Sequence, residues 1–339
     1  MKQLSIENLA YLSSGAALLG SGGGGDPVIL TDFLHYLLSQ HGPVDIISLA
    51  ELKPDDLVVP LAMIGAPLVC IERIPNQDMF VQLFTQIKRD YPDKNIVLMP
   101  AEIGGCNALT PFLLASIYHL PVLDGDLIGR AFPKINMCKP AVNKVSNLQA
   151  YVSSALGECV HFVAHSMPDL EDQARQITMR FGCSAAFSTF IFTADQQEKY
   201  VIPNSIMRAF ELGRQLQAKQ CPEATLITAG VITEVEHRIE NGFLMGHAII
   251  RSQAETYKIL FQNEYLLVFK GQEIIAESPT IISLLETRSK TPIASESLRY
   301  GLQVELVSLA PPAFWDTPSA LAQVNRTAFG MNVEDLKYE

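Results

Sequence analysis

Apolar and polar positions alternate with helical spacing along the first part of the chain. In residues 5–20 the apolar residues recur three and four positions apart, which predicts an amphipathic helix. The same spacing over residues 27–41 predicts a second helix, with Asp26 as its N-cap and Gly42 as its stop. The glycines at 22–25 therefore lie between two helices and lead into the second one.

Farther along, short apolar runs alternate with helical stripes. The helical stripes lie at residues 78–91 and 107–119. The apolar runs, whose length and bounding turn residues predict strands, lie at residues 44–49, 56–65, 95–100 and 121–126. An alternation of strands and helices is typical of a mostly parallel sheet covered by helices, so we expect an α/β N-terminal domain.

The second half of the chain has a different pattern. Helical stripes at residues 168–182 and 204–219 are followed, from Thr225 on, by strand-like runs separated by Gly, Asn and Pro. We therefore expect two domains. Residues 1–165 form the α/β domain with the glycine-rich loop, and residues 166–339 form a helical connection followed by a β-rich C-terminal domain.

The composition is that of a folded protein with a large core. The chain has 339 residues, of which 48% are hydrophobic and 18% are charged. Its net charge is −11 and no run of Lys and Arg offsets it, which argues against nucleic acid and anionic membranes as partners. No apolar run reaches the roughly 18 residues that a membrane-spanning helix needs. We expect a small-molecule substrate instead.

The cysteines indicate the compartment. There are six, widely spaced, and no two of them form a CxxC pair, which argues against a zinc ribbon. Most have apolar neighbours, and such cysteines are typical of a reducing environment, so we expect a cytoplasmic protein. A homo-oligomer is the base-rate expectation for its assembly.

The segment GSGGGGDP is the most unusual feature of the sequence. Its glycines bring backbone N–H groups to the start of a helix, and such groups bind anions. It is neither a Walker motif, since no Lys-Ser/Thr follows, nor a dinucleotide-binding fingerprint, since a helix precedes it. A tight turn between packed helices is the alternative. The predicted substrate-binding residues of this loop are Ser21, Gly22, Gly23, Gly24, Gly25 and Asp26.

The loop PAEIGGCN follows a strand that is expected to be buried. Glu102 then lies beyond the carboxyl end of that strand, where open α/β sheets bind ligands, and we predict a catalytic role for it. Asn107 either caps the next helix or binds the substrate.

The loop PVLDGDLIGRAFP carries two more carboxylates. Alternate residues of an extended chain share one face about 7 Å apart, so Asp124 and Asp126 are predicted to bind a divalent metal, zinc or similar, or to provide a catalytic base. An ordinary Asp-Gly-Asp turn is the alternative. Arg130 either clamps a substrate carboxylate or neutralises the pair.

Polar residues also interrupt the β-rich half. Asn263 and Glu264 lie between two apolar runs, where they form a hairpin turn or close the site from the second domain, since ligands often bind between domains. His237 and His247 are candidate acids, bases or ligands, although a lone His in a strand is more often a core or rim residue.

Several strings occur in the order in which a known family has them and span nearly the whole chain: LLGSGGGGDP, AEIGGCNAL, PVLDGDLIGRAFP, NGFLMGH, FQNEYLLV, LRYGLQVELV and TAFGMN. By these strings the chain resembles the S-methyl thiohydantoin desulfurase-like family, long described as a domain of unknown function found beside hydantoin-utilisation genes. The resemblance implies an α/β N-terminal domain and a β-rich C-terminal domain, in agreement with the pattern of apolar residues.

The resemblance also implies an activity. We expect a hydrolase that acts on a small cyclic amide or thioamide, releases a thiol and leaves a hydantoin, with a metal-activated water as a suitable nucleophile. The family's glycine loop commonly begins with Cys where this chain has Ser21. This difference favours the alternative, a non-catalytic small-molecule-binding or partner subunit of a hydantoinase-type system.

Overall fold

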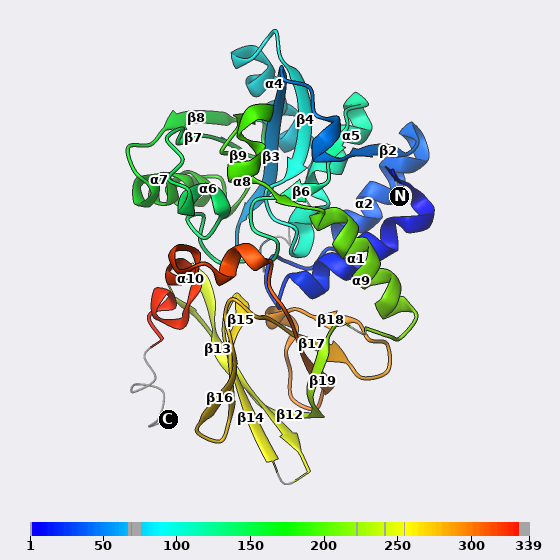
Figure 1. The fold of residues 1–339 in the computed structure, drawn as a ribbon, viewed down its shortest axis with the longest axis vertical. Helices are drawn as coiled ribbons and strands as arrows, with labels where there is room; N and C mark the ends of the chain where they lie inside the picture. The colour runs from blue at the N-terminus through cyan, green and yellow to red at the C-terminus, as the bar shows by residue number, and fades with distance from the viewer. Residues whose placement is uncertain are drawn as a thin grey trace.

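The computed structural model shows two parts stacked along the long axis of the molecule (Figure 1). The upper part is a sheet covered by helices, and the lower part is mainly an antiparallel sheet. The structure describes residues 2–66, 69, 76–221, 223–240, 242–253 and 255–331.

The upper sheet has the strand order β1-β2-β5-β4-β3-β9-β7-β8, and β10 pairs with β3 outside this path. Its strands are β1 (Gln3–Leu4), β2 (Val44–Ile47), β3 (Asp56–Gly65), β4 (Asn95–Pro100), β5 (Val122–Leu123), β7 (Gln149–Ser153), β8 (Cys159–Val163), β9 (Ser184–Thr189) and β10 (Phe192–Thr193). The pairs β2–β5, β5–β4 and β4–β3 are parallel, and the others are antiparallel. The predicted α/β domain is confirmed, with a mixed sheet, because β7, β8 and β9 extend the parallel strands in antiparallel fashion.

The helices of the upper part bury this sheet. They are α1 (Ile6–Leu19), α2 (Val28–His41), α4 (Gln77–Asp90), α5 (Thr110–Tyr118), α6 (Lys139–Val142), α7 (Met167–Arg180), α8 (Gln197–Tyr200) and α9 (Ser205–Gln217). All but the last two residues of β3 are buried, as expected for a central strand covered on both faces. α9 packs along α1 near the junction of the two parts (Figure 1).

A small two-stranded sheet joins distant segments of the upper part. Its strands are β6 (Gly125–Asp126) and β11 (Ile202–Pro203), which pair antiparallel. The chain beyond residue 165 thus still contributes α7, β9, β10, α8, β11 and α9 to the upper part, and the lower sheet begins at Thr225.

The lower sheet has the order β16-β15-β14-β13-β12-β19-β17-β18. Its strands are β12 (Thr225–Glu240), β13 (Phe243–Ser252), β14 (Glu255–Gln262), β15 (Glu264–Lys270), β16 (Glu273–Glu277), β17 (Ile281–Glu286), β18 (Pro292–Ile293) and β19 (Gln303–Leu309), and α10 (Pro318–Val324) follows them. Every pairing is antiparallel. The predicted β-rich C-terminal domain is therefore confirmed.

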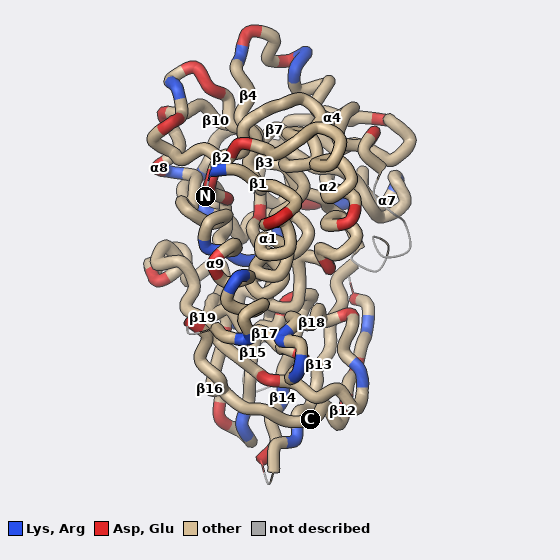
Figure 2. The backbone as a smooth tube through the Cα atoms, turned by 90° about the vertical axis from the view of Figure 1, so that its right-hand side faces the viewer, with Lys and Arg blue, Asp and Glu red and all other residues tan. Residues whose placement is uncertain are grey.

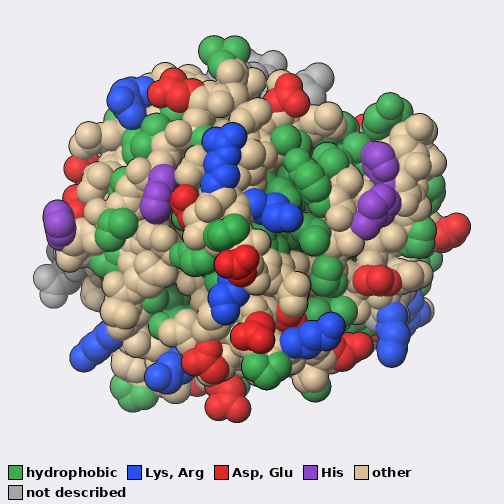
Figure 3. Space-filling model, turned by 90° about the horizontal axis from the view of Figure 1, so that it is seen from above, with side chains coloured by type: hydrophobic (Ala, Val, Ile, Leu, Met, Phe, Trp, Pro, Cys, Tyr) green, Lys and Arg blue, Asp and Glu red, His purple; other side chains and the backbone are tan. Residues whose placement is uncertain are grey.

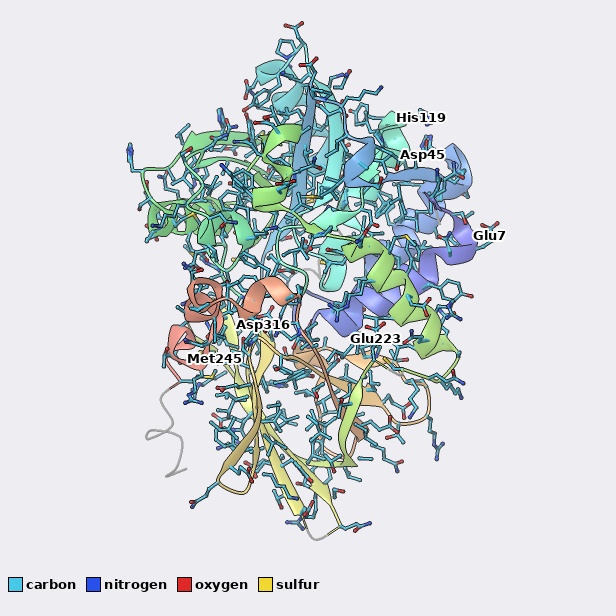
Figure 4. All side chains as sticks on the ribbon, viewed as in Figure 1. Glu7, Asp45, His119, Glu223, Met245 and Asp316 are labelled. Carbon is cyan, nitrogen blue, oxygen red and sulfur yellow. The ribbon has the colours of Figure 1, made fainter. Side chains whose placement is uncertain are left out.

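The charged side chains at the surface do not gather in one place. Figure 2 shows acidic and basic residues along both parts, and on the face seen from above the two signs are interspersed (Figure 3). Glu7, Asp45 and His119 lie at the outer edge of the upper part, whereas Met245 and Asp316 lie near the junction (Figure 4). Among the described residues, no helix has the length and apolarity needed to cross a bilayer.

Candidate functional site

A cavity of about 450 Å³ lies where the glycine turn, the Glu102 loop and the turn between β14 and β15 meet. Of the predicted site residues, the structure brings together around it Gly24, Gly25, Asp26, Glu102, Asn107, Asn263 and Glu264. Its apolar wall includes Val28, Ile29, Met63, Leu127, Phe132 and Phe190. An apolar hollow with a few polar groups is typical of a small-molecule site.

Two of the four glycines make room for the lower sheet. A Cβ on Gly22 would lie 2.4 Å from the ring of Tyr265, and a Cβ on Gly23 would lie 2.1 Å from the carboxylate of Glu264. Real Cβ atoms do not approach so closely, so only glycine lets these two side chains of β15 reach the turn. The glycine turn is therefore also the place where the two parts contact each other.

The other two glycines make room for the Glu102 loop. A Cβ on Gly24 would lie 2.5 Å from the carbonyl oxygen of Gly104, and one on Gly25 would lie 3.3 Å from the Cys106 Sγ. The Cys106 N–H donates to the carbonyl oxygens of both glycines, at 3.0 and 3.2 Å. A run of four glycines is thus needed because each one meets a different neighbour.

Asp26 lies one residue before the N-cap of the second helix, not at the predicted N-cap position itself. Its Oδ1 accepts a hydrogen bond of 3.0 Å from the N–H of Val28, where α2 begins, and Pro27 occupies the N-cap position. Asp26 also lines the cavity. Its side chain thus holds the helix start beside the site.

Glu102 is buried in the cavity wall, with 8% of its surface exposed. Its two oxygens accept hydrogen bonds of 3.4 Å from the Asn107 side chain and from the N–H of Phe132. Burial raises its pKa well above the ordinary value, and the nearby Glu264 raises it further. Both causes favour the protonated form of the Glu102 carboxyl group.

Asn107 does not cap the following helix. Its Oδ1 accepts a hydrogen bond of 2.7 Å from the N–H of Met63 in β3, and its amide group donates to Glu102. α5 begins at Thr110, with Leu109 as its N-cap. Asn107 thus ties the carboxyl end of β3 to the Glu102 side chain.

Glu264 reaches the cavity from the other part of the molecule. It is 2% exposed, and its Oε2 has no hydrogen-bond partner among the described residues. Burial raises its pKa to about 8, while the Arg130 guanidinium and a backbone hydrogen bond from Gly24 act in the opposite direction. The anion that the glycine turn was expected to bind is, in part, this carboxylate.

Asn263 combines its two predicted roles. It has a left-handed φ of 58° in the turn between β14 and β15, and its Oδ1 accepts a hydrogen bond of 2.9 Å from the N–H of Leu244. It also lines the cavity beside Glu264. Its hairpin-turn chemistry is what directs the Glu264 side chain toward the upper part.

Arg130 is fully buried but does not line the cavity. Its Nη1 donates to the carbonyl oxygens of Pro279 and Thr280 at 2.7 and 2.8 Å, and its guanidinium lies 4.4 Å from the centre of the Phe132 ring. Burial lowers its pKa to about 10, and the charges of Glu264 and Glu102 oppose that shift. Arg130 therefore joins the two parts and acts on the cavity through its charge.

Asp124 and Asp126 lie outside the cavity lining. The Asp124 Oδ1 accepts from the N–H groups of Ile206 and Met207 at the start of α9. The Asp126 carboxylate accepts three backbone N–H groups and the Ser205 hydroxyl. Among the described residues, no group of three His, Cys, Asp or Glu has the arrangement of a metal site. Asp126 is occupied through both oxygens and Asp124 through Oδ1, so the pair does not have the arrangement predicted for a metal site.

Ser21 is also directed away from the cavity. It is fully buried, with a left-handed φ of 53°. Its Oγ donates to the carbonyl oxygen of Ile282 at 2.7 Å and accepts from the Ile282 N–H at 3.1 Å. Ser21 thus holds β17 against the glycine turn, and it does not line the cavity.

The two histidines singled out in the sequence lie apart from the cavity lining. The His237 Nε2 is 2.9 Å from the carbonyl oxygen of Ser295. His247 lies between the carboxylates of Glu234 and Glu236, at 3.0 and 3.3 Å. Both are rim or surface residues of the lower sheet.

Other residues of the cavity were not predicted. Cys106, Cys138, Lys134 and Arg175 line it as well. Cys106 lies within the PAEIGGCN loop, directly after its two glycines. Because this loop was predicted to border the site, the position of Cys106 in it could have indicated a cavity residue. Lys134 comes just after the PVLDGDLIGRAFP segment, and nothing in its own neighbourhood indicates a site.

Comparisons with known proteins agree with this architecture. The family model of the S-Me-THD-like N-terminal domain matches residues 7–164, and that of the S-Me-THD-like C-terminal domain matches residues 165–338. A protein from Chromobacterium violaceum, solved by X-ray crystallography, is similar in fold, with a TM-score of 0.80 and 20% sequence identity over 95% of each chain. No curated protein matches the sequence.

Proposed function

Because this chain belongs to the S-methyl thiohydantoin desulfurase-like family, we propose that it hydrolyses an S-alkylated thiohydantoin-type ring, a small cyclic amide or thioamide. The reaction consumes water, releases a thiol and leaves the hydantoin. The observation that carries the proposal is the pair of buried carboxyl groups, Glu102 and Glu264, that line one apolar cavity from the two parts of the molecule.

Glu102 has the properties of a general acid. Its raised pKa favours the protonated carboxyl group, which is able to donate a hydrogen bond to a ring nitrogen. Proton donation to that nitrogen makes the carbon that bears sulfur a stronger electrophile. Asn107 fixes the orientation of this carboxyl group through its amide.

Glu264 has the properties of a general base. A pKa of about 8 lies close to the working pH, where a base both accepts and returns a proton efficiently. Its unpartnered Oε2 is the buried acceptor of the site. Burial of such an atom costs free energy, and a bound substrate or water that donates to it would recover that cost.

The proposed roles of Glu102 and Glu264 do not involve the two residues predicted to bind a metal. Asp124 and Asp126 accept backbone N–H groups and lie outside the cavity lining, so we route no step through a metal at that position.

The test is turnover of 2-(methylthio)-imidazol-4-one by the purified protein, with hydantoin and methanethiol measured together. We expect kcat/KM to rise with pH through about 8, as Glu264 ionises. Glu102→Gln and Glu264→Gln should each lower kcat by about 10²–10⁴-fold, whereas Glu273→Gln, on the exposed start of β16, should not. A wild-type protein that turns over none of this compound would contradict the proposal.

The alternative, a non-catalytic binding subunit, makes a different prediction for the same experiment. The ring compound would then raise the melting temperature of the protein without being consumed. The difference at Ser21, which favoured this alternative, lies outside the cavity lining.

A further inference from the structure

We propose that Cys106 is the nucleophile of this cavity and that the reaction passes through a covalent bond between its Sγ and the ring carbon. This inference rests on the proposed function and names the group that attacks. Cys106 is 9% exposed and lines the cavity together with both carboxyl groups.

The thiol lines the same cavity as the two acids and is linked to each through one neighbour. Its Sγ lies 4.0 Å from the Asn107 Oδ1, and the Nδ2 of the same amide lies 3.4 Å from the Glu102 Oε1. The sulfur also lies against Gly25, two residues from Gly23, against which the Glu264 carboxylate packs. Asn107 thus links the sulfur to Glu102, and the glycine turn links it to Glu264.

The backbone that carries this sulfur is held in place. The Cys106 N–H donates to the carbonyl oxygens of Gly24 and Gly25, and the residue is the second of the short 3-10 helix Gly105–Ala108. A nucleophile whose backbone is already positioned loses less entropy at the transition state.

A second and independent observation points to a ligand at the same place. The Glu264 Oε2 is buried in the cavity wall without a hydrogen-bond partner among the described residues. An amidine-like ring carries N–H groups that fit such an acceptor. A ring bound in this way lies next to the thiol.

The cavity offers a contrasting thiol. Cys138 also lines it, but burial raises the pKa of that thiol to about 12, so almost none of it is thiolate at neutral pH. Cys138 packs within the apolar core below the sheet. Chemistry that needs a thiolate is therefore disfavoured at Cys138.

The first half of the reaction exchanges one sulfur for another. Glu264 takes the thiol proton, a bond forms between the Cys106 Sγ and the ring carbon, and the ring nitrogen receives the proton of Glu102. The bond between the carbon and the methylthio group then breaks. Methanethiol leaves with the proton held by Glu264, and Glu102 takes back its proton from the ring nitrogen.

The second half consumes water. Glu264 takes one proton of a water molecule, and the oxygen of that water bonds to the same ring carbon. Glu102 again protonates the ring nitrogen. The bond to Cys106 then breaks, the thiolate recovers the proton from Glu264, and the hydroxyl proton passes to Glu102 as the carbonyl forms. The sum is the ring compound plus water giving hydantoin plus methanethiol, with no change of oxidation state.

The experiment mixes the full-length protein with 2-(methylthio)-imidazol-4-one, quenches in acid within the first turnover and analyses peptides by mass spectrometry. We expect an adduct on Cys106 with the mass of the compound minus methanethiol, and none on Cys138. Glu264→Gln, measured in parallel, should form the adduct more slowly than the wild type, because Glu264 takes the thiol proton in the first half. Absence of the adduct from the wild type at every quench time while it turns over would overturn the covalent step.

Variants give the second readout. Cys106→Ala and the near-isosteric Cys106→Ser should lower kcat on the order of 10³-fold or more, with melting curves that show both are folded. Cys159→Ala, on the edge strand β8, should keep the wild-type rate. Turnover that survives in folded Cys106→Ala refutes the nucleophile and leaves the hydrolase proposal intact. A wild type with neither turnover nor adduct refutes both.

Discussion

Gly24 and Gly105 lie backbone against backbone, so that a Cβ on Gly105 would be 2.3 Å from the carbonyl oxygen of Gly24. Both have left-handed φ angles, 72° and 70°. Two loops that are about 80 residues apart in the sequence therefore meet without side chains between them. This contact holds the Glu102 loop and the Cys106 thiol at the glycine turn, and it lets the cavity form beside them.

Gly24→Ala should destabilise the protein more than its backbone angle alone predicts. Gly42 is the matched control, since it has a φ of 84° but nothing within 4 Å of its Cβ position. We expect Gly42→Ala to lower the free energy of unfolding by about 1 kcal/mol. Gly24→Ala should lower it by about 1–3 kcal/mol more, because the added methyl group overlaps the Gly104 carbonyl. Equal losses in urea unfolding would show that the close contact is unimportant.

Glu264 should make the wild-type protein less stable as the pH rises. Its pKa is about 8 when folded, against an ordinary 4.5, so its favourable contribution is complete below pH 4.5 and is lost as the pH rises through 8. The expected change is a few kcal/mol. In the wild type, the melting temperature should fall between pH 5 and 9 as Glu264 ionises. Glu264→Gln should lack this fall, and the exposed Glu273→Gln should keep it. Parallel slopes for all three proteins would contradict a buried, titrating Glu264.

Ser21→Ala should affect stability and not chemistry. The variant leaves the buried Ile282 N–H without its acceptor, at a cost of about 1–3 kcal/mol. The folded enzyme should keep kcat within about 2-fold, since loss of a hydrogen bond outside the cavity does not alter the reacting groups. Ser21→Cys, which restores the usual family residue, should not raise kcat. A marked gain of activity in Ser21→Cys would mean that this position takes part in the reaction.

Asp126 should behave as a structural residue. Asp126→Ala leaves three buried backbone N–H groups without an acceptor, and we expect unfolding to become easier by about 3 kcal/mol or more. Asp126→Asn retains one carbonyl oxygen and should lose less stability while keeping most of kcat. Calorimetric titration with zinc should not distinguish the wild type from Asp126→Asn. A folded, stable Asp126→Ala without turnover would instead indicate a chemical role.

Lys134 should recognise an anionic substituent on the ring. It lines the cavity and is half-buried, and no ion pair with a described residue neutralises it. Lys134→Gln should raise KM about 10-fold for a ring compound that carries a carboxylate, and have little effect on the unsubstituted ring. The exposed Lys199→Gln is the control. An equal rise in KM for both compounds would show that the substitution distorts the cavity, and it would contradict specific recognition of the carboxylate by Lys134.

The order and type of the main elements follow from the sequence alone. Apolar spacing predicted the helices on either side of the glycine turn, and α1 and α2 are there. It also indicated the change to a β-rich second domain. This works because burial of an apolar stripe depends on the local period of the chain, which neighbouring residues carry. The sequence also placed the glycine turn between two helices, Glu102 beyond a strand end and Glu264 in a turn between two strands. Because ligands often bind at such ends and between domains, these residues were predicted as one site.

Only the tertiary structure decided which polar residues face the cavity. Asp126 bonds Ser205, which is 79 residues away, and Asp124 bonds Ile206, 82 residues away, and neither residue lines the cavity. The close packing of α1 against α9 was also decided by the tertiary structure. A Cβ on Gly15 of α1 would lie 1.7 Å from the carbonyl oxygen of Ala209 of α9. The direction of a loop side chain is set by the donors that surround it after folding. Local sequence carries no record of those donors, because they come from segments that meet only in three dimensions.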